Sequence, residues 1–451
     1  MTPGPPIGNH RVMPSQFDPP SGTRDLLAAD VERRERAFAI VRSVFSRYGF
    51  EPLQTPAFER LDVLLGKYGE EGDKLVFKIL RRGEHEASGE ADLALRYDHT
   101  VPLARVAAAY GSQLPTPYKR YALGPVWRAD RPGKDRYREF TQCDLDTLGS
   151  QSLLADAEVL SAHHDAFAEL GVPDFAILLN SRRVLAGMLE AFSVQPEIGS
   201  GVLASLDKLD KLAPAEVISE LTGRGLAPDQ AGELVAALTG PDSADRVRVA
   251  LSKTEEGTAG LDEVDSMLSL LAGQLPANRI AFTPRLVRGL SYYTGPIWEF
   301  AAAGVAGSVG GGGRYDHLLE QLGGPDVPAT GTSIGIERIL PLLPGAEGAM
   351  PGRLDVAVTV MRSDLAPQSF AFAAAARSAG LRASVYLGSS GKLGRQLKWA
   401  SDSGARWCLI YGEQEHEAGI ATVRDMASGE QAQVPVADIG TYFAGAGLGA
   451  S

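Results

Sequence analysis

Residues 126 to 149 have the sequence VWRADRPGKDRYREFTQCDLDTLG, which is typical of two strands joined by a loop with a Pro-Gly turn. Successive side chains of a strand point to opposite faces of a sheet, so the second strand would carry Phe140, Gln142, Asp144 and Asp146 on one face. The stretch therefore predicts a hairpin with one polar face.

The loop of this hairpin is cationic. Five basic residues lie within eleven positions: Arg128, Arg131, Lys134, Arg136 and Arg138. Guanidinium groups bind phosphate oxygens in pairs and an aromatic ring such as that of Phe140 stacks on a base, so the loop would suit a nucleotide. An exposed hairpin with ordinary surface ion pairs explains the same residues, and on this stretch alone it is slightly favoured because charge runs are common.

Composition sets broad limits. A chain of 451 residues exceeds the size at which single cores stop growing, so two or more domains are expected. Hydrophobic residues make up 44% and charged residues 22%, as in soluble globular proteins, and no apolar run is long enough to cross a bilayer. Two cysteines, Cys143 and Cys408, provide no disulfide framework and favour a cytoplasmic location. A net charge of -12 excludes a generally basic surface for coating nucleic acid, including DNA, but not a local basic patch.

The composition and the hydrophobic pattern change along the chain and divide it into segments. Residues 1–20 lack the order of a secretory signal and predict a disordered leader. A helix follows, with Phe38, Val41 and Phe45 on one face and Gly49 as its stop. Residues from about 195 to 275 are charged and lack strand runs, which predicts a helical insertion. The Pro- and Gly-rich stretch 343–353 contains a linker at 346–352. Strands alternate with helices beyond it, so residues 353–451 are expected to form an α/β domain.

Other motifs fail when tested. The stretch GSVGGGGRYD, 307–316, opens no dinucleotide-binding helix, and positive φ angles or close approach to a ligand explain its glycines better. The stretch GSSGKLG, 388–394, has the wrong spacing for a phosphate loop.

His163 and His164 have no metal-ligating neighbour at helical spacing, so a surface or packing role is expected instead of zinc binding. Asp144 and Asp146 suit either magnesium or water, and spacing does not decide between them.

Taken together, these stretches resemble the class II aminoacyl-tRNA synthetases, and within them the histidyl-tRNA synthetase family, from about Ser21 to about residue 440. FEPLQTPAFE resembles the dimer-forming motif 1, VWRADRPGKDRYREF motif 2, and GTSIGIERIL the arginine-bearing motif 3. LVRGLSYYTG, 286–295, and GGGGRYDHLLEQLGG, 310–324, resemble the two histidine motifs. The resemblance implies an α/β protein: a catalytic domain over 21–345 built on the antiparallel sheet of the class, with the helical insertion, and an anticodon-binding domain over 353–451.

The resemblance also implies which residues bind ATP. Arg128 would hold the α-phosphate, Arg136 and Arg338 the γ-phosphate, and Phe140 the adenine ring. Arg288 stands among apolar residues, where a charge acts most strongly on a developing negative charge. It would contact the amino-acid carboxylate and the α-phosphate. The alternative is a buried Arg–carboxylate pair, which the glycines and tyrosines around Arg288 disfavour.

Histidine recognition is implied in the same way. Asp98, Thr100 and Gln142 would receive the α-ammonium, and Asp146 and Tyr293 would bind the imidazole nitrogens. A carboxylate and a phenol can satisfy both ring nitrogens. The full group implied for histidine is Asp98, Thr100, Gln142, Asp146, Arg288, Tyr292, Tyr293 and Tyr315.

The implied reaction is attack of the histidine carboxylate on the α-phosphate of ATP with Mg²⁺ present, followed by transfer of the histidyl group to histidine tRNA by a homodimeric cytoplasmic enzyme. Three positions depart from the family pattern: Ser291, Asp135 and Gly133. Two alternatives stay open. One is a paralogue that passes an activated amino acid to a non-tRNA acceptor, and the other is a non-catalytic regulatory subunit of histidine biosynthesis.

Overall fold

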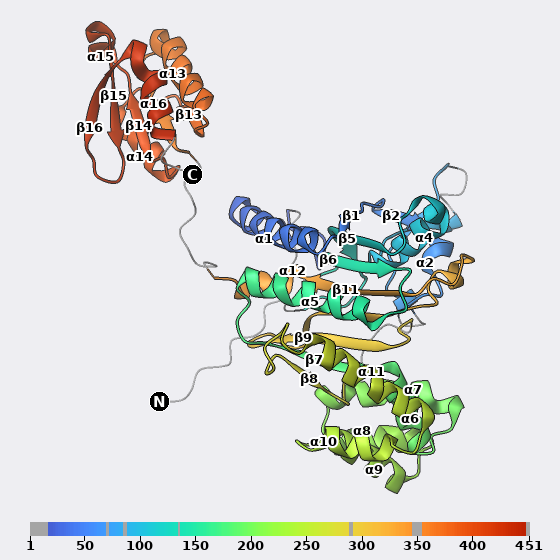
Figure 1. The fold of residues 1–451 in the computed structure, drawn as a ribbon. Helices are drawn as coiled ribbons and strands as arrows, with labels where there is room; N and C mark the ends of the chain where they lie inside the picture. The colour runs from blue at the N-terminus through green and yellow to red at the C-terminus, as the bar shows by residue number, and fades with distance from the viewer. Residues whose placement is uncertain are drawn as a thin grey trace, which may run out of the picture. The chain divides into compact units, whose positions relative to one another are not determined.

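Figure 1 shows the chain as a computed structural model that describes residues 17–68, 72–83, 88–133, 136–287, 292–344 and 354–447. Two units are present, Met1–Ala346 and Glu347–Ser451, and each is described by itself. The finer domain boundaries expected from the sequence stay predictions. Among the described residues, no helix has the length and apolar character needed to cross a membrane.

An eight-stranded sheet forms the centre of the first unit. Its strands, in spatial order, are β1 (Glu51–Pro52), β5 (Tyr118–Trp127), β6 (Glu139–Leu148), β11 (Ala329–Gly335), β10 (Ser308–Arg314), β9 (Pro296–Ala302), β7 (Phe175–Ser181) and β8 (Ile280–Phe282). The outer pairs β1–β5 and β7–β8 are parallel, and all neighbouring pairs between β5 and β7 are antiparallel. The sheet thus has the antiparallel centre expected from the resemblance.

The predicted hairpin is the β5–β6 pair. Its register sets Arg120 opposite Asp146 and Val126 opposite Phe140. The odd-numbered residues Cys143 and Leu145 belong to the main hydrophobic core, which leaves the even-numbered residues of β6 on the other face. The prediction of a hairpin with one polar face is therefore confirmed.

Helices cover the core face of the sheet. They are α1 (Ala28–Arg47), α5 (Leu153–Leu170) and the short α12 (Ile336–Ile339), with the 3₁₀ turn Leu340–Leu342 after it. In Figure 1 these helices lie along one side of the sheet. Phe38, Val41 and Phe45 of α1 are buried in the core, as the helical pattern predicts. The side chain of Ser152 caps α5, accepting a hydrogen bond from Leu154 N at 3.2 Å.

A second, smaller hydrophobic core lies in the same unit. It contains the three-stranded sheet β2 (Phe58–Arg60), β4 (Ala91–Leu95) and β3 (Lys78–Leu80) in that order, with α2 (Leu61–Leu64), α4 (Thr100–Tyr110) and the 3₁₀ turns Gly111–Gln113 and Glu320–Leu322. Tyr68, Tyr97, Tyr292 and Tyr315 are all buried in this cluster. Segments far apart in sequence thus meet at one site.

Helices occupy most of the chain between β7 and β8. They are α6 (Arg182–Ala191), α7 (Pro196–Leu206), the 3₁₀ turn Asp207–Asp210, α8 (Pro214–Gly223), α9 (Pro228–Leu238), α10 (Ser243–Leu251) and α11 (Glu255–Leu271). A proline stands in the first turn of α7, α8 and α9, where its missing N–H costs nothing. The helical insertion of the expected fold class is present.

The second unit is a mixed sheet with helices. The strand order is β13 (Ala383–Val385), β12 (Val356–Val358), β14 (Trp407–Ile410), β15 (Ile420–Asp425) and β16 (Gln431–Pro435). The helices are α13 (Ala366–Ser378), α14 (Leu393–Asp402), α15 (Glu413–Ala418) and α16 (Ile439–Gly447), with 3₁₀ turns at Ser363–Leu365 and Val436–Asp438. β12 pairs in parallel with β13 and β14, and the remaining pairs are antiparallel. The predicted α/β fold class is confirmed for the chain.

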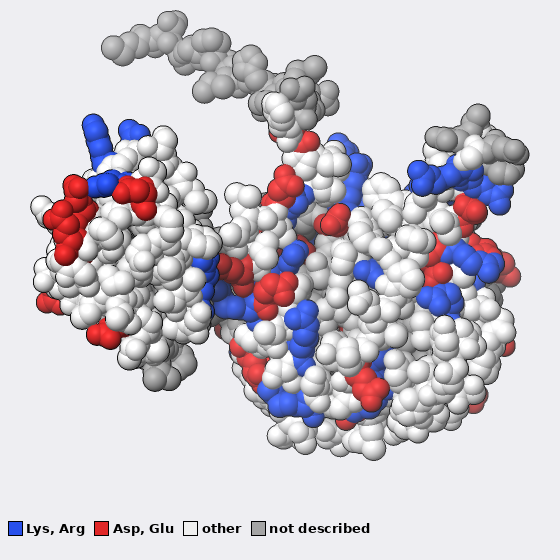
Figure 2. Space-filling model, turned by 90° about the horizontal axis from the view of Figure 1, so that it is seen from above, with Lys and Arg blue, Asp and Glu red and all other residues white. Residues whose placement is uncertain are grey.

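Figure 2 shows the charges on one face of the molecule. Basic and acidic side chains are interspersed there among uncharged surface, and no field of one sign covers it.

Candidate active site

The polar face of β6 carries a buried ion pair. Arg120 Nη2 lies 2.8 Å from Asp146 Oδ2, and both side chains are almost fully buried. Tyr315 donates its hydroxyl proton to Asp146 Oδ1. Burial raises the pKa of Asp146, while the charge of Arg120 and the bond from Tyr315 oppose that rise. Both oxygens of the carboxylate are therefore held in place before any ligand enters.

Asp98 is fixed at the start of α4. Its Oδ1 accepts hydrogen bonds from the backbone nitrogens of Thr100 and Val101, each at 3.1 Å, and from the Tyr68 hydroxyl at 3.2 Å. Burial raises the pKa of Asp98, and these donors work against the rise. Thr100 belongs to the same turn, so the sequence DHT places a carboxylate at the positive end of a helix.

Gln142 lies on the same face of β6 as Asp146. Its Nε2 donates to Ser333 Oγ of β11 at 2.9 Å. This bond connects the hairpin to motif 3, whose strand pairs with β6 along its whole length.

Three tyrosines close the site. Tyr292 and Tyr293 have ring centroids 5.1 Å apart, and Tyr292 and Tyr315 are 5.6 Å apart. Burial raises the pKa of all three phenols, so they remain neutral hydrogen-bond donors near neutral pH. The structure brings together the three tyrosines that the sequence assigned to histidine binding.

Arg128 follows β5 and is held by two rings. Its guanidinium carbon lies 4.2 Å from the centroid of Tyr97 and 5.2 Å from that of Phe140. Its Nε donates to Tyr97 O at 3.2 Å. The aromatic contacts fix the direction of a charge that would otherwise be mobile.

The other expected cations occupy different surroundings. Arg136 is exposed and forms an ion pair with Asp130 at 3.1 Å. Arg338 of α12 donates to Ser308 O at 2.6 Å. Gly133 is exposed and bridges to Arg136. Arg288 and Ser291, with Lys134 and Asp135, lie outside the described residues, so the expected contacts of Arg288 stay a prediction.

The glycine-rich strand has a structural explanation that differs from the expected one. Residues 310–313 lie in the extended strand β10, and none of them has a positive φ angle. A Cβ at Gly310 would come within 2.6 Å of His163 Cε1, and one at Gly312 within 2.6 Å of Thr332 Cα. These four glycines allow close approach to neighbouring parts of the chain, whereas Gly307 of the same stretch has the expected positive φ, of 84°. His163 is buried and stacks on Phe300 with centroids 3.7 Å apart, which confirms its packing role.

Gly331 faces Asp146 across the β6–β11 pair, and a Cβ there would overlap the Asp146 carboxylate. We expect Gly331→Ala to displace this carboxylate from Tyr315, raising the histidine KM at least about tenfold and lowering the free energy of unfolding by about 1–3 kcal/mol. Steady-state kinetics and chemical denaturation would measure both effects. The control is Gly232→Ala in α9, where a Cβ meets nothing within 4 Å and stability should rise by about 0.5–1 kcal/mol. An unchanged histidine KM in Gly331→Ala would contradict the role of Asp146.

Sequence reasoning missed several residues of the site. Arg120 was not singled out, although extending the hairpin register from its turn pairs position 120 with position 146. Tyr68 and Tyr97 could not be found in this way because they reach the site through the separate small core. Glu337 is also buried, and its Oε2 accepts a hydrogen bond from Thr141 N at 2.9 Å.

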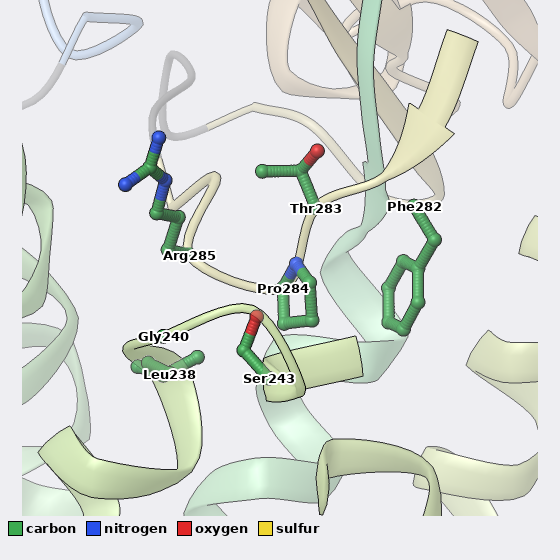
Figure 3. A pocket seen from close by; sticks show the side chains of 7 residues that line it. All are labelled: Leu238, Gly240, Ser243, Phe282, Thr283, Pro284 and Arg285. Carbon is green, nitrogen blue, oxygen red and sulfur yellow. The ribbon is translucent and has the colours of Figure 1, made fainter. Parts of the chain in front are cut away.

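Two cavities are found in the described part of the chain. One of about 330 Å³, drawn in Figure 3, is lined by Leu238, Gly240 and Ser243 of the insertion and by the 282–285 segment after β8. Another of about 280 Å³ borders the hairpin at Pro125 and Phe140. Neither cavity is lined by the residues implied for histidine, of which Asp98, Asp146, Tyr292 and Tyr315 are buried.

Metal ligands are sparse in the described part of the chain. The single grouping of three suitable side chains there is His317, Glu320 and Asp326, all exposed. It lies outside the polar face of β6 and offers no support for a metal there. Magnesium bound with a triphosphate keeps several water and phosphate ligands, so this scarcity is compatible with an ion held chiefly by ATP.

An antiparallel sheet, a cationic hairpin with stacked aromatic rings, and an arginine on the helix after β11 together define a class II aminoacyl-tRNA synthetase. The family model for histidyl-tRNA synthetase matches residues 22–339, and the anticodon-binding-domain model matches residues 355–445. The chain belongs to the histidyl-tRNA synthetase family.

Individual relatives agree. The chain is similar to the histidine–tRNA ligase of Gloeobacter violaceus, with 38% identity over 94% of this chain and 97% of the relative. It is 40% identical to that of Ruegeria pomeroyi over 91% of this chain and 90% of the relative. The crystal structure of histidyl-tRNA synthetase from a Nostoc species superimposes with a TM-score of 0.76 at 29% identity, over 95% of this chain and 99% of that one. These relatives favour tRNA charging over both alternative functions.

Proposed function

We propose that this chain activates histidine with ATP and transfers it to the 3′ end of histidine tRNA. The observation that carries the proposal is the buried Arg120–Asp146–Tyr315 group beside the stacked Arg128. Burying a charged group costs folding free energy even when it is paired, and a ligand-binding role accounts for its presence here.

In the first step, a histidine carboxylate oxygen attacks the α-phosphate and pyrophosphate leaves. Arg128 and Arg288 would stabilise the negative charge that gathers on the α-phosphate, and Phe140 would stack on adenine. Arg136 and Arg338 would hold the γ-phosphate. Magnesium, when bound with ATP, would neutralise charge on the departing pyrophosphate.

Recognition of the imidazole ring is proposed for Asp146, Tyr293 and Tyr315. Because Arg120 and Tyr315 already hold both oxygens of Asp146, the carboxylate would receive a ring N–H without changing its position. A side chain without ring nitrogens would leave these buried groups unpaired, which is a strong basis for rejection.

The second step would place the tRNA 3′ end at the adenylate, while the second unit binds the anticodon. Lys392, Arg395 and Lys398 near α14 are proposed to contact phosphates. A homodimer and a cytoplasmic location are part of the same proposal, the dimer because of the motif 1 resemblance.

Histidine-dependent ATP–pyrophosphate exchange tests the first step. We expect exchange with histidine and Mg²⁺ and none above background with phenylalanine, tyrosine or glutamine. Exchange with any of these at a comparable kcat/KM would contradict the proposed specificity.

A further inference from the structure

Three buried acceptor oxygens share the polar face without a hydrogen-bond partner in the described part of the chain. They are Asp98 Oδ2, Gln142 Oε1 and Asp144 Oδ1. Asp98 and Asp144 are each only 2% exposed. Buried polar atoms in native proteins are nearly always paired, so three unpaired acceptors at one place indicate a missing donor.

Asp144 lies between the two groups already assigned to histidine. Its side chain points to the same face of β6 as Gln142 and Asp146, and its register partner on β11 is Ser333, which also receives the Gln142 amide. Burial raises the pKa of Asp144, the charge of Arg120 opposes that rise, and the charges of Asp146 and Asp98 add to it, so all three groups lie within electrostatic reach.

Arginines stand near these carboxylates without pairing with the three oxygens. Arg120 pairs with Asp146, and its Nη2 also donates to His99 O at 3.0 Å. Arg96 is close enough for Asp144 to stabilise its charge, but it donates to the backbone oxygens of Thr55, Pro56 and Pro125. Among the described residues, no donor therefore reaches Asp98 Oδ2, Gln142 Oε1 or Asp144 Oδ1.

A primary ammonium group supplies what is missing. It carries one positive charge and three N–H donors, which matches three acceptor oxygens. We propose that Asp144 binds the α-ammonium of the amino-acid substrate directly, together with Asp98 and Gln142. The inference rests on the proposed function and extends it, because neither the resemblance nor the ion pair assigns a ligand contact to Asp144.

The test is Asp144→Asn, which preserves size and removes the charge. We expect a histidine KM about 10- to 100-fold higher in pyrophosphate exchange, because a charge-assisted hydrogen bond is lost. The ATP KM should change less than about twofold, and the variant should be as stable as the parent, since a buried charge has been removed. Asp144→Ala is the second variant if the Asn side chain adopts another hydrogen bond.

Two histidine analogues isolate the ammonium. L-histidinol retains the amine and lacks the carboxylate, whereas imidazole propionate retains the carboxylate and lacks the amine. Asp144→Asn should weaken inhibition by histidinol by the same factor as it raises the histidine KM, and leave inhibition by imidazole propionate unchanged. Equal weakening of both analogues would overturn the inference, because Asp144 would then act on the ring or the pocket shape.

Thr147→Val provides the matched control. Thr147 is 2% exposed on the same strand, on the opposite face, and its Oγ1 is also unpaired among the described residues. This variant should leave both inhibition constants unchanged. A parent protein without histidine-dependent exchange would refute the proposed function itself, whereas an active parent with an unaffected Asp144→Asn refutes only this inference.

A pH comparison gives an independent reading of the same contact. The groups facing Asp144 are Arg120 on β5, Asp146 on β6, Asp98 and Arg96 before α4, and Tyr293 before β9. Burial raises the pKa of Asp144 to about 7, so the carboxylate becomes neutral as the pH falls. As the pH falls from about 8 to 6, the histidine KM should therefore rise more steeply in the parent than in Asp144→Asn. The imidazole ring of the substrate also titrates in this range, but it affects both proteins equally. Identical profiles would overturn the inference.

Discussion

Replacing Arg128 by alanine is expected to abolish adenylate formation while the chain remains folded. The guanidinium is held by Tyr97 and Phe140, and we propose that it binds the α-phosphate. Removing a preorganised charge of this kind typically costs about 10²–10³ in kcat. Arg128→Lys should be nearly as inactive, because an ammonium cannot reproduce the planar fork.

Pyrophosphate exchange measures this loss, and circular dichroism measures the fold. The stability cost should be small, about 0.5–2 kcal/mol from the lost ring contacts. The control is Arg131→Ala in the same loop, where the side chain is exposed and activity should persist. Equal losses of exchange activity in Arg128→Ala and Arg131→Ala would contradict a specific role for Arg128, because only the total charge of the loop would then affect activity.

Replacing Asp146 by alanine should affect both folding and recognition. Breaking a buried ion pair leaves Arg120 uncompensated, which typically lowers the free energy of unfolding by about 3–5 kcal/mol. Tyr315 loses its acceptor at the same time. The histidine KM should rise at least about a hundredfold, far more than the ATP KM, because a buried charged contact is lost.

A double variant separates the two effects. Arg120→Met with Asp146→Leu replaces both charges by apolar groups of similar size, which typically restores stability. We expect denaturant unfolding to return towards the parent value while histidine-dependent exchange stays absent. Recovery of exchange in the double variant would show that Asp146 serves the fold and not the substrate.

The hairpin could be predicted from residues 126–149 because strand alternation and a Pro-Gly turn are local signals. Its register even contains the Arg120–Asp146 pair. The roles of Tyr68 and Tyr97 could not be predicted, since they depend on a small core that joins distant segments. The glycines of β10 were misjudged for a related reason: what excludes a Cβ there is His163 of α5 and the strand β11, which local sequence does not reveal.

The candidate site, too, could be predicted from the sequence only in part. The resemblance grouped Asp98, Gln142, Asp146 and Tyr315, and we propose that they bind histidine together. The sequence did not decide whether Asp144 binds magnesium or water, because residue spacing carries no information on burial. Its unpaired oxygen and its raised pKa appear only when β6 is enclosed by β5, β11 and the segment before α4.

Transfer of labelled histidine to a histidine-tRNA transcript tests the central claim most directly. With ATP and magnesium present, we expect stoichiometric charging by the parent and none by Arg128→Ala. Histidine-dependent pyrophosphate exchange without charging would contradict the account, because the activated amino acid would then be destined for an acceptor other than tRNA.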